Sequence, residues 1–329
     1  MVKEHVRKYL CENRLELGSF PTPIQLLNLS KEVGGDYGIY IKRDDLTGIG
    51  LGGNKIRFLE YLLYEAKKKG SDIVIASGPN QSNLCMLTAA CCNRMGMDCQ
   101  VVVNSERPNI QTGNELLNKL MDVPREYLGP VSEEERAAFV DDLAASLKHA
   151  GRRPYIIRNG ASSGLGAMGY VNAAYEIYEQ NKALDYGIQH IFAPGANGGV
   201  AAGLILGNYL LGCPFTIHVI SVEYDLEKMN DCIQGVILES QELLGIEPKE
   251  IYDGVVMYEE FRGSGWGEDT VESRAEVSSF AKREGIFIEN IYTSKTVVGM
   301  EAVIRRGELR GNAIYIHTGG LGALFSQYE

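Results

Sequence analysis

Residues 42–55 read Lys-Arg-Asp-Asp-Leu-Thr-Gly-Ile-Gly-Leu-Gly-Gly-Asn-Lys, and the last of them, Lys55, opens an amphipathic segment. A lysine in the first turn of a helix lies where the helix dipole disfavours positive charge. Its amine therefore loses a proton more easily, and a neutral amine can condense with a carbonyl group. Taken alone, the stretch is equally compatible with a solvated lysine that begins a helix.

The segment after Lys55 has the periodicity of a helix that is buried on one side. Leu59, Leu62, Leu63 and Ala66 recur at i, i+3, i+4 and i+7, which places them on one helical face. Further along the chain, strands alternating with helices predict an α/β protein with largely parallel sheets flanked by helices. The polar stretch 104–132, which contains three prolines, is expected to be a long loop. The predicted strands are residues 39–42, 73–76, 100–103, 155–158, 190–193, 216–222 and 313–317.

The bulk properties restrict the function. At 329 residues the chain is long enough for two compact domains, since single cores stop growing at about 250–300 residues. A net charge of −11 leaves no basic surplus for nucleic acid or an anionic membrane, so a small molecule is the expected partner. The seven cysteines form no C-x-x-C pair, which predicts reduced thiols and no metal site. Residues 1–14 carry charge throughout and no long apolar segment occurs, so we expect a cytoplasmic protein.

Three turns follow predicted strands, at residues 77–83, 195–199 and 318–322. Because the carboxyl ends of parallel strands line the ligand crevice of such folds, we expect all three turns at one cleft. The second turn reads Gly-Ala-Asn-Gly-Gly and precedes a helix that starts near Val200. Helix N-termini bind anions, so phosphate is the expected ligand, although a tight packing turn has the same sequence pattern.

The other two turns carry polar side chains. Ser82 or Asn83 can cap the helix that follows, and the same hydroxyl and N–H groups could hold a substrate carboxylate. Thr318 comes after an apolar strand, and its hydroxyl could bond a pyridine nitrogen without protonating it. A ring with such a partner is a weaker electron sink than one paired with a carboxylate, which favours elimination over transamination.

A second interpretation rests on two glycine patterns of the form G-x-G-x-x-G. One lies in residues 48–53, and the other, residues 164–169, precedes a helical pattern and has Asp185 downstream. This is the fingerprint of a nicotinamide-binding turn. The pattern is weak in a chain with 38 glycines, and neither copy runs straight out of a strand. For these reasons a nicotinamide-dependent oxidoreductase is the second interpretation and not the first.

Taken together, these segments resemble one family. The chain is similar to the D-cysteine desulfhydrase and 1-aminocyclopropane-1-carboxylate deaminase group of pyridoxal-phosphate enzymes, within the fold-type II, tryptophan-synthase-β-like superfamily. The resemblance runs from Pro21 to Phe325. Its strongest segments are residues 39–60, 81–90, 159–173, 292–295 and 315–325.

The resemblance implies an architecture and an assembly. A large pyridoxal-phosphate-binding domain would comprise residues 1–57 and 166–329, and a small domain residues 58–165. The cofactor would lie in the cleft between the two domains. Relatives are usually homodimers, so the same assembly is expected here.

The resemblance also assigns roles to residues. Lys55 would carry the Schiff base of pyridoxal 5'-phosphate, and Lys55, Ser82 and Tyr292 would form the catalytic set. The cofactor would be held by Asn54, Asn83, Gly195, Ala196, Asn197, Gly198, Gly199, Val200 and Thr318, with Asn83 at its 3′ oxygen and Thr318 at its pyridine nitrogen. A small amino acid substrate would contact Gln81, Ser82, Asn83, Leu84, Trp266 and Tyr292.

Three positions bear on the substrate. Thr293 stands where the deaminases of the family carry an acid after the tyrosine, which favours β-elimination of the D-cysteine desulfhydrase type, giving keto acid, ammonia and sulfide. Leu84 replaces a histidine or glutamine, and Trp266 replaces the tyrosine of a Gly-Tyr-Gly sequence. Neither replacement can transfer a proton as the usual residue can. Ring opening of the cyclopropane acid, a related small substrate and a non-catalytic cofactor-binding protein remain as alternatives.

Overall fold

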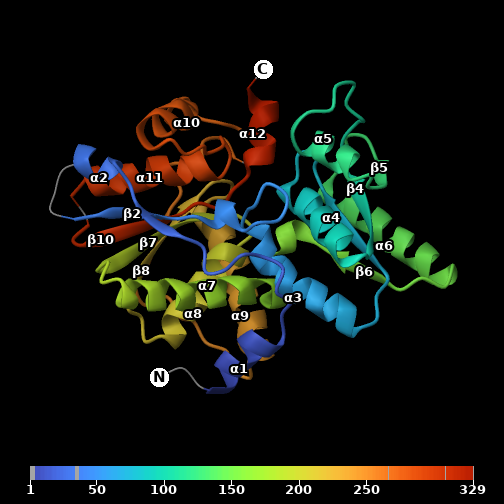
Figure 1. Ribbon diagram of the computed structural model, residues 1–329, viewed down its shortest axis with the longest axis horizontal. Coiled ribbons are helices and arrows are strands. Elements are labelled where there is room, and N and C mark those ends of the chain that lie inside the picture. The colour runs from blue at the N-terminus through green and yellow to red at the C-terminus, as the bar shows by residue number, and fades with distance from the viewer. Residues whose placement is uncertain (1–3, 34–36, 266, 308, 329) are drawn as a thin grey trace.

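The computed structural model describes residues 4–33, 37–265, 267–307 and 309–328, and it arranges them as two sheets with helices on their faces (Figure 1). The strands are largely parallel, so the predicted α/β class with helix-flanked parallel sheets is confirmed. The larger sheet draws its strands from both ends of the chain, whereas the smaller sheet uses the intervening part.

The larger sheet has six strands in the order β1-β2-β10-β7-β8-β9. All neighbouring pairs are parallel except β1 and β2, which pair antiparallel at one edge. Its inner strands β7 and β8 are almost continuously buried because helices cover both faces of the sheet. The strands are β1 Ile24–Leu26, β2 Ile39–Lys42, β7 Ile188–Gly195, β8 Thr216–Ser221, β9 Val255–Tyr258 and β10 Asn312–Ile316.

Helices α7, α8 and α9 lie on one face of this sheet, and α10 and α11 lie on the other (Figure 1). Two glycines let α8 pack closely on α7: a Cβ on Gly203 would lie 2.5 Å from Tyr170, and one on Gly207 would lie 2.5 Å from Ala174. The helices of this part are α1 Glu4–Glu12, α2 Leu29–Glu32, α7 Gly164–Ala183, α8 Gly199–Leu210, α9 Leu226–Leu243, α10 Val271–Glu284, α11 Thr293–Arg305 and α12 Leu321–Gln327.

The smaller sheet has four parallel strands in the order β5-β4-β3-β6. Its strands are β3 Ile73–Gly78, β4 Asp98–Val103, β5 Arg125–Tyr127 and β6 Pro154–Ile157, and its helices are α4 Asn83–Met95, α5 Gly113–Leu120 and α6 Glu133–His149. Helix α3, Lys55–Lys68, packs against both α7 and α4 and so joins the two parts. Short 3₁₀ turns at Asp44–Leu46 and Asn159–Ala161 precede α3 and α7.

The strands predicted from apolar runs are all present, with ends that differ by at most two residues. The short strands β1, β5 and β9 escaped prediction because few of their side chains are buried. The predicted long loop at 104–132 is wrong, since it contains α5 and β5. Helix α5 has only eight residues and buries polar side chains, among them Asn114, Glu115 and Asn118, while Leu116 and Leu120 are exposed, so an apolar pattern does not mark its buried face.

Candidate active site

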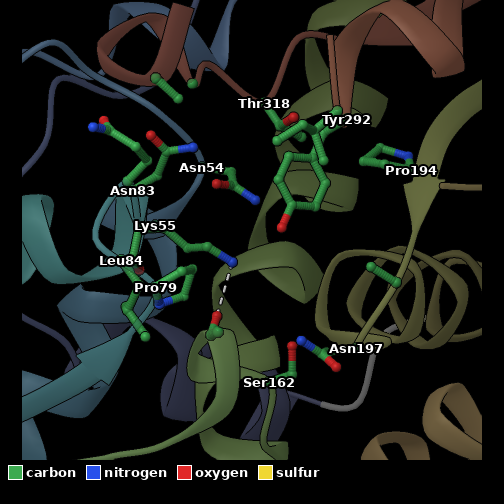
Figure 2. A pocket seen from close by; sticks show the side chains of 18 of the residues that line it. Asn54, Lys55, Pro79, Asn83, Leu84, Ser162, Pro194, Asn197, Tyr292 and Thr318 are labelled. Carbon is green, nitrogen blue, oxygen red and sulfur yellow. Dashed lines mark hydrogen bonds between the residues drawn. The ribbon is translucent and has the colours of Figure 1, made fainter. Parts of the chain in front are cut away.

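One cavity of about 490 Å³ opens where the strands of both sheets end. The three turns predicted to share a cleft all line it, as do the start of α3 and the start of α11 (Figure 2). The lining includes every described residue of the predicted site except Gly195, which adjoins them on β7: Asn54, Lys55, Gln81, Ser82, Asn83, Leu84, Ala196, Asn197, Gly198, Gly199, Val200, Tyr292 and Thr318. Trp266 lies outside the described residues.

The glycine turn before Lys55 fixes where helix α3 begins. Gly52 adopts a φ of +74°, and a Cβ there would clash with the carbonyl of Asp45, so only glycine fits. The Gly53 N–H donates to the Thr47 hydroxyl at 3.0 Å. The Asn54 N–H donates to the carbonyl of Thr318 at 2.9 Å, which joins this turn to the turn after β10.

The Lys55 amine points into the cavity, where its Nζ donates to the carbonyl of Gly160 at 2.8 Å (Figure 2). The ring centroid of Phe58 lies 5.0 Å from Nζ. Burial lowers the pKa of Lys55 to about 8. The helix dipole argument predicts the same direction, but removal from water is the cause. An appreciable fraction of the amine is therefore neutral and nucleophilic near neutral pH.

A buried ionic network holds the helix that carries Lys55. Arg57 contacts Asp44 at 2.7 Å and Glu176 at 2.9 Å, and Lys42 contacts the same Glu176. Tyr170 adds a hydroxyl that donates to Asp44 at 2.8 Å. The charges are mutually paired, as buried charges must be, so β2, α3 and α7 are tied together directly behind the site.

The turn that joins β7 to α8 has the properties of an anion cradle. Gly198 adopts a φ of +85° and directly precedes the first turn of α8, whose N–H groups have no partners within the helix. The Gly199 N–H points toward the Ser162 hydroxyl at 3.3 Å, and the Tyr224 hydroxyl donates to Asn197 Oδ1 at 3.2 Å. A Cβ on Gly199 would lie 2.7 Å from the Phe58 ring, so the backbone is accessible only while position 199 is glycine.

The start of α4 forms the opposite side of the cavity. Ser82 caps this helix, because its hydroxyl accepts from the Cys85 N–H at 3.3 Å. Leu84, only 2% exposed, lines the cavity with an apolar surface beside the cap. The capping prediction for Ser82 is confirmed, and the free N–H groups of the first turn leave room for a carboxylate.

Asn114 orients Asn83. The Asn114 Nδ2 group donates to Asn83 Oδ1 and to the Gln81 carbonyl, each at 2.8 Å, and the Asn114 N–H donates to Gln81 Oε1 at 2.9 Å. Since the Asn83 oxygen is engaged, its Nδ2 faces the other way, toward Gly320. Gln81 is thus occupied with the backbone and side chain of α5, although it reaches the cavity wall.

Glu289 holds the start of α11, the helix that follows Tyr292. Its carboxylate accepts from the N–H groups of Ile291, Tyr292 and Thr293 at 2.7–2.8 Å and from the Thr293 hydroxyl at 3.0 Å. Figure 2 shows the Tyr292 ring entering the cavity with its hydroxyl directed toward the side where Lys55 lies. The carboxylate therefore fixes the backbone from which the tyrosine projects.

His317 supports the turn that carries Thr318. Its Nδ1 accepts from the Gly319 N–H at 3.1 Å and its Nε2 donates to the Phe287 carbonyl at 2.8 Å, which defines a neutral ring. Burial lowers the pKa of His317 and keeps it uncharged. Thr318 itself is 7% exposed and lines the cavity near Asn54 (Figure 2). His317 therefore supports the turn after β10 through both ring nitrogens.

The site fits a phosphate-bearing aldehyde. It combines a nucleophilic amine, a glycine turn at a helix N-terminus and a second helix N-terminus for a carboxylate. The alternative glycine pattern has another explanation, because Gly164, Gly166 and Gly169 lie inside α7, where a Cβ on each would meet the backbone of a neighbouring segment. Sequence reasoning missed Asn114, Ser162, Glu223, Glu289 and Arg136. The partners of Asn114 and Ser162 lie more than 30 residues away, whereas Glu289 acts on its own neighbours, residues 291–293.

Comparisons with known proteins agree with this geometry. A family model described as "Pyridoxal-phosphate dependent enzyme" matches residues 15–319. A protein named putative 1-aminocyclopropane-1-carboxylate deaminase, from Pyrococcus horikoshii, is 36% identical, with 95% of this chain and 93% of that protein covered. A D-cysteine desulfhydrase from Klebsiella pneumoniae is 31% identical over 96% of each chain.

A solved structure described as an ACC deaminase homologue matches with a TM-score of 0.90 and 35% identity, covering 98% of this chain and 97% of the other. None of the described helices is both long and apolar enough to cross a bilayer.

Proposed function

This chain belongs to the pyridoxal-phosphate dependent enzyme family, and from that premise we propose that it cleaves a small amino acid by β-elimination of the D-cysteine desulfhydrase type. The products would be a keto acid, ammonia and, from D-cysteine, sulfide. The observation that carries the proposal is the Lys55 amine, held in the cavity by Gly160 with its pKa lowered to about 8. The family match decides against the nicotinamide alternative.

The chain offers a group for each part of the cofactor. Lys55 supplies the amine for the covalent link, and the phosphate is assigned to the turn of Gly195, Ala196, Asn197, Gly198, Gly199 and Val200. Asn83, whose amide nitrogen is set by Asn114, suits the 3′ oxygen. Thr318 suits the pyridine nitrogen, and the Asn54 N–H joins the Thr318 turn to the lysine turn.

When bound, the cofactor supplies an aldehyde for amines and a ring that accepts electrons from the substrate's α-carbon. Once its amine is free, Lys55 can remove the proton at that carbon, because its lowered pKa leaves part of it neutral. The N–H groups at the start of α4, together with Ser82, bind the substrate carboxylate. Tyr292 projects into the cavity from the segment fixed by Glu289, where it can give a proton to the departing group.

The other candidate reaction is ring opening of the cyclopropane acid, which is favoured by the name of the P. horikoshii relative. Thr293 argues against it. Its side chain is fully buried and its hydroxyl is bonded to Glu289, so position 293 offers no carboxylate to the cavity. Leu84 adds an apolar surface next to the presumed carboxylate position, which suits a substrate that needs no proton transfer there.

The test combines labelling with a substrate panel. Borohydride reduction of the yellow holoprotein should fix the cofactor on Lys55, as peptide mapping would show, and Lys55→Ala should remove both the label and turnover. Lys69→Ala, an exposed lysine paired with Glu65, is the control. D-cysteine, L-cysteine, diaminopropionate, D-serine and the cyclopropane acid are then assayed for ammonia and keto acid. A label on another residue contradicts the site, and no product from any compound favours a non-catalytic protein.

Three broader features belong to the same proposal. We place the large domain at residues 1–57 and 166–329 and the small domain at residues 58–165, supported by the separate origin of the two sheets. A homodimer is proposed from the resemblance to relatives. A cytoplasmic location is consistent with seven free cysteines, all within the described residues.

A further inference from the structure

The cavity is also lined by charged side chains to which the proposed cofactor and a substrate as small as D-cysteine assign no role. Arg136, on α6, lines it and is only 3% exposed. Its Nη1 donates to Asn104 Oδ1 at 2.7 Å, and its Nη2 lies 3.3 Å from Glu133 Oε1. Its Nε has no hydrogen-bond partner among the residues that the structure describes.

The protein compensates this guanidinium only weakly. The side chain of Glu133 is 64% exposed, so water screens the pair and the contact stabilises little. Asn104 is a neutral partner. A buried cation is costly unless an anion or several strong acceptors surround it, and Arg136 has the fork geometry that matches a carboxylate. The guanidinium is therefore suited to a carboxylate that arrives with a ligand.

The larger sheet presents an acid to the same cavity. Glu223 lines it from the segment after β8. Glu133 lines the same cavity. Burial raises the pKa of Glu223 and the charge of Glu133 raises it further, whereas a hydrogen bond from Tyr224 and the charge of Lys295 lower it. Lys295 fixes the Glu223 segment, because its Nζ donates to the Val222 carbonyl at 3.2 Å. A positively charged ligand group near Glu223 would relieve the repulsion between the two acids.

We propose that Arg136 and Glu223 bind the leaving group of the substrate, and that this group is itself zwitterionic. The inference rests on the proposed β-elimination. The substrate class is then a thioether amino acid whose sulfur joins two amino acid heads, as in lanthionine. One head is processed beside Lys55. The carboxylate of the other pairs with Arg136 and its ammonium with Glu223.

Water is the only other reactant that the reaction needs. The α-carbon loses a proton, the bond between the β-carbon and sulfur breaks, and sulfur keeps the electron pair and takes a proton. Lanthionine plus water then gives pyruvate, ammonia and cysteine. The new product is a thiol amino acid in place of free sulfide.

The test compares four cysteine thioethers, each as separate enantiomers: S-methylcysteine, S-aminoethylcysteine, S-carboxymethylcysteine and lanthionine. Keto acid release is measured on holoenzyme, and each kcat/KM is divided by that for S-methylcysteine. We expect lanthionine to have the highest ratio. Arg136→Met should lower the ratios of the two carboxylate-bearing leaving groups by about 10- to 100-fold, the loss of one charge-assisted contact.

Glu223→Gln should lower the ratios of the two ammonium-bearing leaving groups instead. Arg136→Lys keeps the charge but not the fork and should give an intermediate ratio. The matched control for arginine is Arg125→Met, which removes a buried pair with Glu115 at 3.1 Å in the same part of the fold, outside the cavity lining. Glu65→Gln serves the same purpose for glutamate. Neither control should change the ratios.

The outcomes separate the two proposals. If S-methylcysteine or D-cysteine releases keto acid but lanthionine has no advantage, or the variants change all ratios equally, the leaving-group site is wrong and the β-elimination stands. If no compound of either panel releases keto acid, the β-elimination itself fails. If only the carboxymethyl compound gains, Arg136 binds an anionic leaving group and the role of Glu223 is overturned.

Discussion

Arg57 donates two parallel hydrogen bonds to the carboxylate of Asp44, from Nε to Oδ2 and from Nη2 to Oδ1, each at 2.7 Å. Both side chains are at most 2% exposed, and Arg57 lies two residues after Lys55 on α3. The geometry is the bidentate arrangement in which arginine pairs most strongly with a carboxylate. Lys55 therefore lies on a helix whose first turn is fixed by a buried ion pair.

Removing one partner of this pair should be strongly destabilising. We expect Asp44→Asn to lower the free energy of unfolding by about 3–5 kcal/mol, because it leaves a buried guanidinium undercompensated. The comparison is Glu179→Gln, which breaks the exposed pair with Arg7 and should cost less than about 1 kcal/mol. Urea denaturation of both variants measures the difference. Equal stabilities would contradict the role given to the network.

Asn114 should control cofactor affinity without touching the cofactor. Asn114→Ala frees the Asn83 amide to rotate. We therefore expect the dissociation constant of the cofactor to rise on the order of tenfold, which corresponds to the loss of about one hydrogen bond. Absorbance titration of apoprotein measures it. The control is Asn93→Ala, which should leave the affinity unchanged. It also removes a hydrogen bond between α4 and the end of α5, but an exposed one, from Asn93 to the Met121 carbonyl. A similar loss in both variants would indicate a general effect on α4.

The phosphate turn should tolerate no side chain. A Cβ on Gly199 would lie 2.7 Å from Phe58 and 2.9 Å from the Ser162 hydroxyl, so Gly199→Ala should displace the first turn of α8. We expect weaker binding of pyridoxal phosphate and a smaller preference for it over pyridoxal, which lacks the phosphate. Gly235→Ala is the control, because nothing lies within 4 Å of that position. An unchanged preference would place the phosphate elsewhere.

His218 should make stability depend on pH. It bonds His190 Nδ1 at 3.1 Å and the Tyr258 hydroxyl at 3.0 Å, and burial lowers its pKa to about 3. The unfolded chain takes up a proton near pH 6.5, whereas the folded protein does not. Stability is therefore full above about pH 6.5 and falls as the pH drops from there toward 3, by about 2 kcal/mol at pH 5. His218→Phe should flatten this slope, whereas the exposed His149→Gln should not.

The sequence predicted the parts of this site that depend on local chain geometry. The glycine turn before Lys55, the Ser82 cap and the glycine turn at Gly198 are read from neighbouring residues, and each is in its expected place. Asn114 was missed because its partners lie 31 and 33 residues away and it sits in a helix with polar residues inside. Arg136 and Glu223 line one cavity only because the two sheets share it.

Burial was the physical quantity that sequence could not supply. The dipole argument gave the right direction for the pKa of Lys55, but the cause is the removal of the amine from water. Thr293 likewise stood out only as a departure from a family pattern, whereas its buried bond to Glu289 shows what it does. The prediction for Trp266 falls outside the described residues and stays a prediction.

Helix α12 completes the wall of the cavity with Ala323, Ser326 and Gln327, and it is fastened to α5 where the Thr112 hydroxyl donates to the Phe325 carbonyl at 3.1 Å. Anything genetically fused to the end of the chain would therefore be attached only two residues after Gln327, which lines the ligand space. An affinity tag there could hinder ligand entry mechanically, and a protease that trimmed the last turn would open the chamber to solvent. A purification handle is better joined to the opposite terminus, next to α1.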